Sequence, residues 1–210
     1  CLAYDNTISR PWKAAESLKT PVLGLLDAAT TARNPHAPYF EAHRDELRHI
    51  YINLHSREYM PKSILFTSVE ENGEEHSPAE AFAAYALKYH NRKPVVVRYS
   101  TTSDAASIQH ESAEASLPGL PVYSRNLNNL PKERILWEKL KSNCDLLVIE
   151  YAPLRQGEFL FALVESMDEA VVGIEMERSD KNYVRQVVAL LRQYGMATPG
   201  LLLQKRLENA

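Results

Sequence analysis

The chain has 210 residues, of which 45% are hydrophobic and 24% charged, and its formal net charge is -3. This length suits one α/β domain with a buried sheet, and the composition excludes an intrinsically disordered protein. A slightly acidic chain gives no support for nucleic-acid binding, which needs a basic surface to neutralise phosphates.

Short apolar runs rich in β-branched residues alternate with amphipathic segments along the whole chain. Such runs predict buried parallel strands when helices separate them. The expected strands cover residues 21–26, 63–68, 94–99, 120–123, 145–151, 170–176 and 200–205. The expected helices cover residues 39–55, 78–91, 131–143, 157–166 and 179–194. This alternation predicts an α/β fold with a doubly wound, mostly parallel sheet, in which ligands bind beyond the carboxyl ends of the strands.

The ends and connections of these elements carry weaker signals. Ser179 is the expected N-cap of the last helix, and Gly195 is its expected stop. Residues 27–40 are polar and contain prolines, which predicts a linker, and residues 100–119 form a long polar segment.

The turn between the second expected strand and the next helix lies where a phosphate-binding loop often occurs. Such a loop needs backbone N–H groups, a lysine and a Mg²⁺-binding hydroxyl, but this turn has one glycine, no lysine and several glutamates. One unit charge at about 4 Å contributes roughly 4 kcal/mol at an effective dielectric of 20, which is about the whole binding energy of a millimolar ligand. We therefore expect no phosphate binding at this loop. The residues where the phosphate-binding groups would be expected are Gly73, Glu74, Glu75, His76 and Ser77.

The glutamates of this turn have a simpler explanation. Glu74 and Glu75 precede a helix expected to begin at about Pro78, where acidic side chains complement the helix dipole. A metal site formed with His76 is disfavoured, since consecutive residues seldom converge on one ion.

Polar residues also close two of the expected strands. Arg98 and Ser100 end one strand, and Glu150 ends another. Glu150 in this position has the chemistry to bind Mg²⁺ or to activate water. The alternative, which we favour, is an ion pair between Arg98 and Glu150 across the top of the sheet.

The remaining patterns give no metal, cofactor or nucleophile. The seven histidines form no His-x₃-His pair, the two cysteines form no Cys-x₂-Cys pair, and no serine lies in a Gly-x-Ser-x-Gly motif. Cys1 and Cys144 are expected to be reduced. No apolar run approaches the roughly 20 residues of a membrane span, so the chain as given is expected to be soluble; a first residue other than Met suggests a fragment or a processed product, with room for a membrane anchor upstream.

In its order of elements, the chain resembles the cytoplasmic domain of bacterial tyrosine kinases (BY-kinases) and of polysaccharide co-polymerase chain-length determinants, which are relatives of the ParA/MinD P-loop ATPases. The resemblance covers nearly the whole chain. Residues 10–26 resemble the segment that follows the second membrane helix in the family, and residues 39–54 resemble its Glu-x-x-Arg helix. Residues 62–100 resemble the Walker A unit and the next strand, and residues 130–153 resemble the approach to the Walker B motif. Residues 167–205 resemble the last two strands and the helix between them.

The resemblance implies that the nucleotide site is degenerate. Residues 73–77, Gly-Glu-Glu-His-Ser, replace the family's Gly-x-Gly-Lys-Ser/Thr. Arg98 and Ser100 replace the Asp-x-Asp of the second Walker A motif, and Glu150 matches the Walker B aspartate. Gln204 replaces the adenine-contacting asparagine, and the tail has no tyrosine cluster.

The Glu-x-x-Arg motif is the part that survives, as Glu41 and Arg44, with Arg48 one residue later than expected. In the family this motif lies at the contact between subunits of a ring, which implies an oligomer interface here. Salt links within one helix are the alternative, because the three residues share a helix face.

Together these observations predict a catalytically inactive BY-kinase-like domain, with no cofactor, that serves exopolysaccharide biosynthesis, chain-length control or export. The resemblance implies a juxtamembrane-like segment over residues 1–38, with one strand and a linker, and a P-loop NTPase-like domain over 39–210. It implies a cytoplasmic location at the inner face of the plasma membrane. The expected partners are further copies or another subunit of the export complex, and the membrane through an upstream segment or partner, without nucleic acid. Two alternatives remain: a working ATPase or tyrosine kinase that uses Glu150 for metal and Arg98 for phosphate, and a free soluble ParA/MinD-like partner protein.

Overall fold

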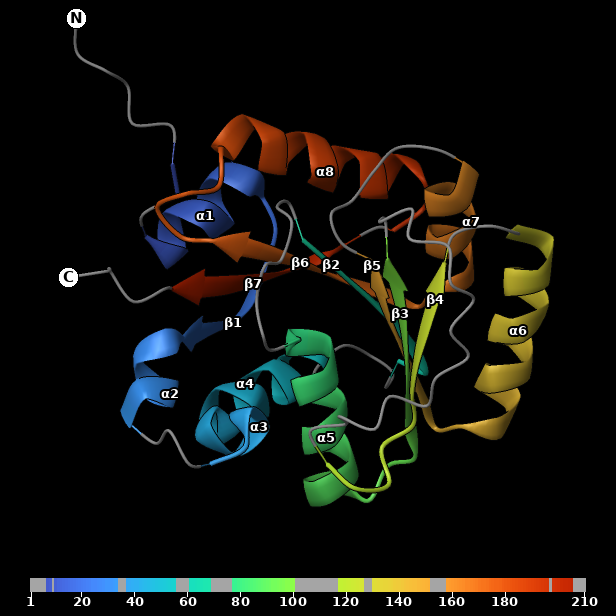
Figure 1. Cartoon of the computed structure of the whole chain (residues 1–210). Coiled ribbons are helices and arrows are strands. Elements are labelled where there is room, and N and C mark those ends of the chain that lie inside the picture. The colour runs from blue at the N-terminus through green and yellow to red at the C-terminus, as the bar shows by residue number, and fades with distance from the viewer. Residues whose placement is uncertain are drawn as a thin grey trace, which may run out of the picture.

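A seven-stranded sheet between two layers of helices forms the centre of the computed structural model (Figure 1). The structure describes residues 7–8, 10–33, 37–55, 61–68, 77–100, 117–126, 130–151, 158–196 and 198–205. The strand order is β1-β7-β6-β2-β5-β3-β4, and every neighbouring pair is parallel. The strands are β1 Val22–Asp27, β2 Ser63–Ser68, β3 Pro94–Ser100, β4 Val122–Asn126, β5 Leu146–Tyr151, β6 Glu169–Glu175 and β7 Gly200–Lys205.

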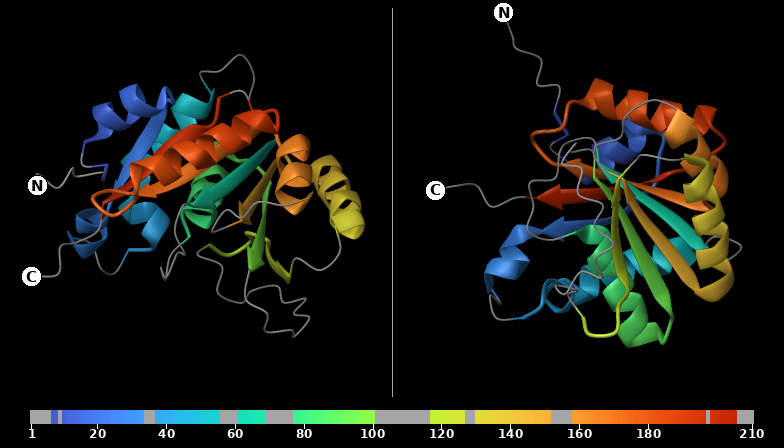
Figure 2. Two further views of the ribbon diagram at one scale, coloured as in Figure 1. Left: turned by 90° about the horizontal axis from the view of Figure 1, so that it is seen from above. Right: turned by 45° about the vertical axis from the view of Figure 1, so that its right-hand side comes forward.

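The helices divide into two layers, one on each face of the sheet (Figures 1 and 2). The first layer consists of α1 Pro11–Leu18, α6 Leu130–Asn143, α7 Glu158–Ser166 and α8 Lys181–Gln193. The second consists of α2 Ala28–Arg33, α3 Tyr39–Ala42, α4 Arg44–His55 and α5 Pro78–His90. This two-sided cover is what the apolar strand runs require, because a parallel sheet buries both of its faces.

The strand β2 illustrates how the sequence specifies both cores. All six of its residues are buried, and successive side chains of a strand point to opposite faces. Leu65 packs into the core below α1, α7 and α8, whereas Ile64 and Phe66 pack into the core against α4 and α5. Burying one such side chain stabilises the fold by about 1.5–3 kcal/mol, so a continuous apolar run supports both layers.

The N-terminal strand packs closely against its neighbours. β1 pairs with β7 from Val22 to Asp27. A Cβ on Gly200 would lie 2.3 Å from Leu23 Cδ1, and a Cβ on Gly24 would lie 2.6 Å from Ile50 Cγ1. Asn53 of α4 also donates to the Leu23 carbonyl at 2.7 Å. The division at residue 38 stays a prediction, but β1 is a member of the common sheet.

The predicted architecture is confirmed, with differences in individual elements. All seven expected strands exist, although the fourth covers residues 122–126 instead of 120–123. The expected linker at 27–40 contains α2, and α1 was not expected, because helices this short show little periodicity. The expected helix 39–55 is broken at His43 into α3 and α4.

The start of the last helix also differs from the expectation. The N-cap of α8 is Asp180, whose Oδ1 accepts from Asn182 N at 2.8 Å and from Tyr183 N at 2.9 Å. Ser179 is buried, and its hydroxyl accepts from Glu175 N at 3.0 Å. Gly195 follows the helix with φ +107°, as expected for a stop. None of the helices that the structure describes has the length and apolar character needed to span a membrane.

Candidate functional site at the carboxyl ends of the strands

The connections of the sheet diverge at β2, which lies between β5 and β6. In a doubly wound sheet, such a switch point opens a crevice beyond the carboxyl ends of the strands. The helix α5 begins above this crevice at Pro78, as predicted. Its N-cap is Ser77, whose Oγ accepts from Glu80 N at 3.1 Å.

A shallow hollow lies at this switch point, with room for about one water molecule. Polar residues from the ends of β2, β5 and β7 meet there with the first turn of α5. Gly173 of β6 faces it, and a Cβ there would lie 3.4 Å from Gln204 Oε1. The described lining residues are Phe66, Thr67, Ser68, Pro78, Ala79, Glu150, Gly173, Leu202 and Gln204.

The carboxylate of Glu150 is bound by two donors from neighbouring elements. Arg98 Nε donates to Glu150 Oε2 at 2.7 Å, across the paired strands β3 and β5. The Ser77 hydroxyl donates to the same oxygen at 2.8 Å. The predicted Arg98–Glu150 ion pair is therefore confirmed, and Ser77 joins it.

A second carboxylate shares the same arginine. Arg98 Nη2 donates to Glu80 Oε2 at 3.0 Å. The side chains of Glu80 and Glu150 are only 12% and 11% exposed, whereas that of Arg98 is 37% exposed. Burial disfavours the charged guanidinium, but the two carboxylates outweigh burial, so the pKa of Arg98 is raised above its usual value. One guanidinium thus binds two nearly buried acids.

The sequence analysis missed Glu80, although a signal for it exists. Ser77-x-x-Glu80 has the spacing of a capping box, in which the third residue after the N-cap turns toward the helix start. The residues Gly73, Glu74, Glu75 and His76 lie outside the described part of the chain. The backbone of Ser100 ends β3 and pairs with Asn126.

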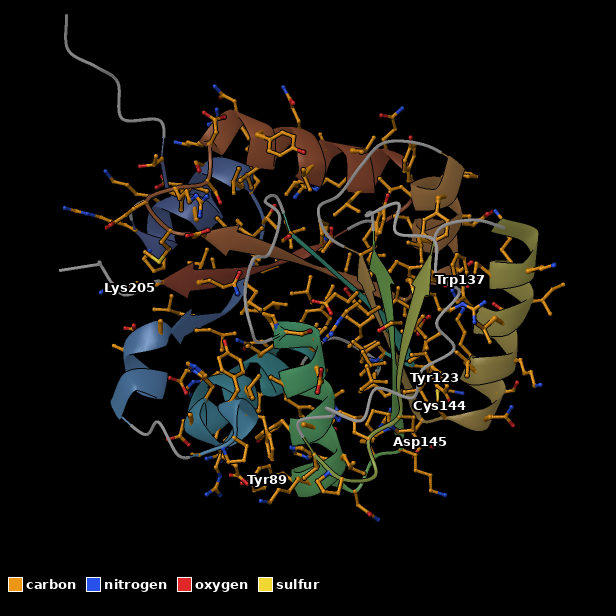
Figure 3. The ribbon with its side chains drawn as sticks, in the orientation of Figure 1. Tyr89, Tyr123, Trp137, Cys144, Asp145 and Lys205 are labelled. Carbon is orange, nitrogen blue, oxygen red and sulfur yellow. The ribbon has the colours of Figure 1, made fainter. Side chains whose placement is uncertain are left out.

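On the other side of β3, a second polar cluster was not predicted. Arg125 of β4 binds Glu133 with Nε at 3.0 and 3.1 Å and with Nη2 at 2.8 Å. Tyr99 OH donates to Glu133 Oε2 at 2.5 Å and accepts from Trp137 Nε1 at 2.8 Å. Trp137 extends from α6 toward the sheet (Figure 3). Burial and the neighbouring Glu133 carboxylate raise the pKa of Tyr99 far above its usual value.

The surviving motif residue Glu41 has partners inside the chain. Its carboxylate binds the Lys88 ammonium and accepts from Tyr89 OH at 2.5 Å. The Arg44 guanidinium lies 4.8 Å from the Tyr89 ring centroid. The hydrogen bonds from Lys88 and Tyr89 lower the pKa of Glu41. Because α3 ends before His43, Glu41 and Arg44 do not share one helix, so a salt link along a common helix was the wrong expectation; the interface stays a prediction.

The described residues contain no group of three or more His, Cys, Asp or Glu side chains arranged to hold a metal ion. Two carboxylates do converge at Arg98, but the bound cation there is the guanidinium. The arrangement can therefore link α5, β3 and β5 electrostatically.

Solved structures with a similar fold include bacterial tyrosine kinase domains. The sequence matches no protein-family model, and no curated protein gives a significant match. The chimerical protein CapA2B2 superposes with a TM-score of 0.71 and 17% identity, over 93% of this chain and 98% of that one. The kinase domain of the Escherichia coli tyrosine kinase ETK gives 0.70 and 14%, over 96% of both chains. The BceF tyrosine kinase domain gives 0.66 and 12%, over 95% of this chain and 99% of that one. The chain therefore has the fold of a bacterial tyrosine kinase domain.

Proposed function

We propose that this chain is a catalytically inactive BY-kinase-like domain that acts as a structural or regulatory component of exopolysaccharide biosynthesis, chain-length control or export. The likeness to tyrosine kinase domains over nearly the full chain supports the kinship. The observation that carries the inactivity is the binding of Arg98 to both Glu150 and Glu80 at the switch point.

The chemistry of this cluster opposes a nucleotide site. By the resemblance, Glu150 stands where the family holds its Mg²⁺, but here an arginine and a serine bind the carboxylate. Arg98 already binds two carboxylates. Their negative charge largely cancels the attraction of the guanidinium for an incoming phosphate. A cationic metal would have to displace the guanidinium before it could reach Glu150.

Calorimetric titration with Mg-ATP tests the inactivity directly. We expect no saturable heat up to millimolar nucleotide, with the ETK kinase domain as a positive control in the same buffer. Saturable binding at micromolar concentration would refute the proposal. Hydrolysis that is lost in Glu150→Gln would instead support the alternative of an atypical ATPase.

A cellular experiment tests the role in polymer production. Deletion of the reading frame is expected to change the length distribution of the exopolysaccharide, measured by size-exclusion chromatography. Re-expression of the Glu150→Gln variant should restore that distribution as well as the unmodified chain does, because no catalytic step is involved. An unchanged polymer in the deletion strain would contradict the proposed role.

Assembly through the Glu41 region is the proposed mode of action. Arg44 and Arg48 are exposed on α4, whereas Glu41 is half-buried against α5. Reversal of the exposed charge in Arg48→Glu is expected to lower the sedimentation coefficient of an assembled form. Lys93→Glu, on an exposed residue before β3, is the matched control. Equal sedimentation of both variants and the unmodified chain would exclude this interface.

A further inference from the structure

The charges of the chain are unevenly divided between two helical regions on opposite faces of the sheet. The α1 and α8 region, residues 10–20 and 175–192, contains seven basic and four acidic residues, a net charge of +3 in a chain whose total is -3. The α3 to α5 region, residues 39–55 and 78–90, contains three basic and four acidic residues, a net charge of -1. The α1 and α8 region is therefore distinctly more basic than the α3 to α5 region.

Contacts between α1 and α8 combine these charges into one surface. The two helices lie side by side over the same face of the sheet (Figures 1 and 2). Arg192 Nη2 donates to the Lys19 carbonyl at 2.6 Å and to Thr20 Oγ1 at 3.0 Å. We call this surface the α1/α8 face. Its exposed basic residues are Arg10, Lys13, Lys19, Arg178, Arg185 and Arg192.

Two of the four acidic residues on this face are engaged with other groups. Asp180 caps α8 by accepting from two backbone N–H groups. Glu175 accepts from Arg178 at 3.3 Å, which neutralises that arginine. Glu16, Glu177 and the cap residue Asp180 are exposed, against six exposed basic residues. Lys13, Lys19 and Arg185 therefore present an excess of positive charge to the outside.

Two further features indicate what this surface contacts. Tyr183, 41% exposed, lies on α8 among the basic residues, and tyrosine is enriched at the level of lipid headgroups. Thr7 forms an antiparallel bridge with Asp180, and Ile8 accepts from Glu177 N at 2.9 Å, so the chain enters the described fold at this face. An upstream segment that holds the domain at a membrane would be attached here.

We infer that the α1/α8 face docks on an anionic lipid surface. For the presence of a membrane, the inference rests on the proposed function. The orientation of the domain on that membrane follows from the unequal charge of the two helical regions. In that orientation, α1 and α8 face the headgroups, while the α3 to α5 layer faces away from the bilayer. Each Lys or Arg near an anionic bilayer strengthens attachment about fivefold, so several together act as a docking surface.

Co-sedimentation with vesicles tests this docking. We expect the chain to bind vesicles of phosphatidylcholine with 30 mol% phosphatidylglycerol, and to bind pure phosphatidylcholine far more weakly. The triple variant Lys13→Glu, Lys19→Glu, Arg185→Glu should bind the anionic vesicles at least about 100-fold more weakly. The control variant Lys62→Glu, Lys93→Glu, Lys139→Glu changes the net charge equally at exposed positions elsewhere and should bind like the unmodified chain.

Three results would overturn the inference. They are absence of binding to the anionic vesicles, equal weakening by both triple variants, and equal affinity for a DNA duplex at the same salt concentration. Circular dichroism must show that each variant is folded, and Lys19→Gln with Arg185→Gln provides a milder pair if the triple variant is not. Absence of vesicle binding would not change the result of the Mg-ATP titration. The docking inference and the proposal of inactivity can therefore be refuted separately.

Discussion

On each side of β3, an arginine binds nearly buried carboxylate groups, but the two arrangements differ. Arg98 and Tyr99 are consecutive, so their side chains point to opposite faces of the sheet. Toward α5, Arg98 is shared by two carboxylates and stays 37% exposed. Toward α6, Arg125 is 32% exposed and binds the single carboxylate of Glu133, whose side chain is 4% exposed and is also bound by Tyr99. The first cluster lies at a ligand-binding position of the fold, whereas the second is part of the core.

The two arginines are similarly exposed, so the clusters differ in their carboxylates, which number two at 12% and 11% exposure in the first cluster and one at 4% in the second. A buried one-to-one pair depends strongly on its partner, because a buried charge without a counter-ion is costly. A cluster near water tolerates a missing partner better and can exchange one cation for another. The predictions below compare the two clusters on this basis.

The largest effect is expected for Arg125→Ala. The substitution leaves the Glu133 carboxylate buried without its cation, which costs about 4 kcal/mol in the free energy of unfolding. Urea denaturation monitored by circular dichroism measures the change. The double variant Arg125→Ala, Glu133→Gln should regain part of the loss, because the unpaired charge is removed. A single-variant loss below about 1 kcal/mol would mean that Glu133 is not buried as described.

A somewhat smaller effect is expected for Arg98→Ala, about 3 kcal/mol, because its two carboxylates retain some contact with water. Glu80, Glu150 and the Ser77 hydroxyl would then face one another without a cation, and oxygen ligands of this kind suit a divalent ion. Millimolar Mn²⁺ should therefore raise the melting temperature of Arg98→Ala but not that of the unmodified chain. Arg125→Ala, tested in the same way, should not respond. A variant insensitive to Mn²⁺ would show that the first cluster cannot exchange its cation.

The sequence predicted the first cluster better than the second for a physical reason. The apolar runs of β3 and β5 fixed the ends of both strands, and side chains at the same edge of a parallel sheet meet. Arg98 and Glu150 are indeed opposite each other in the strand register. Glu80 was missed because its contact with Arg98 depends on how α5 begins. The capping-box spacing of Ser77 and Glu80 is only a weak signal for that start.

The second cluster depends on tertiary packing that local patterns do not encode. The expected strand at 120–123 ended before Arg125, whereas pairing with β3 extends β4 to Asn126. Glu133 lies in a helix, where glutamate is normally exposed, and it is buried in tertiary contacts with Tyr99 and Arg125. The break of the helix at His43 was missed for a similar reason, because the apolar spacing continues across it.

The hydroxyl of Tyr99 offers a smaller test of the second cluster. Tyr99→Phe removes a hydrogen bond to a carboxylate and the acceptor of Trp137 Nε1, at a cost of about 2 kcal/mol near pH 7. Burial and Glu133 raise the pKa of Tyr99 in the folded state. The stabilisation by its protonated form is therefore complete below the unfolded-state pKa of about 10 and is lost as the pH rises above it. The difference in unfolding free energy between the unmodified chain and the Tyr99→Phe variant should shrink from about pH 9 to about pH 11; a constant difference would contradict this account.

The smallest effect is expected for Ser77→Ala, which removes one N-cap and one hydrogen bond to Glu150. The lost cap alone costs about 1 kcal/mol. Ser77→Thr keeps a hydroxyl and should restore most of the loss. Asp180→Ala is the matched control, because it removes the cap of α8 without touching either cluster. Since Ser77 also binds Glu150, combining Ser77→Ala with Arg98→Ala should give a non-additive loss, whereas Asp180→Ala with Arg98→Ala should be additive. Additivity in both pairs would mean that Ser77 serves only as a helix cap and that the first cluster consists of Arg98 and its two carboxylates alone.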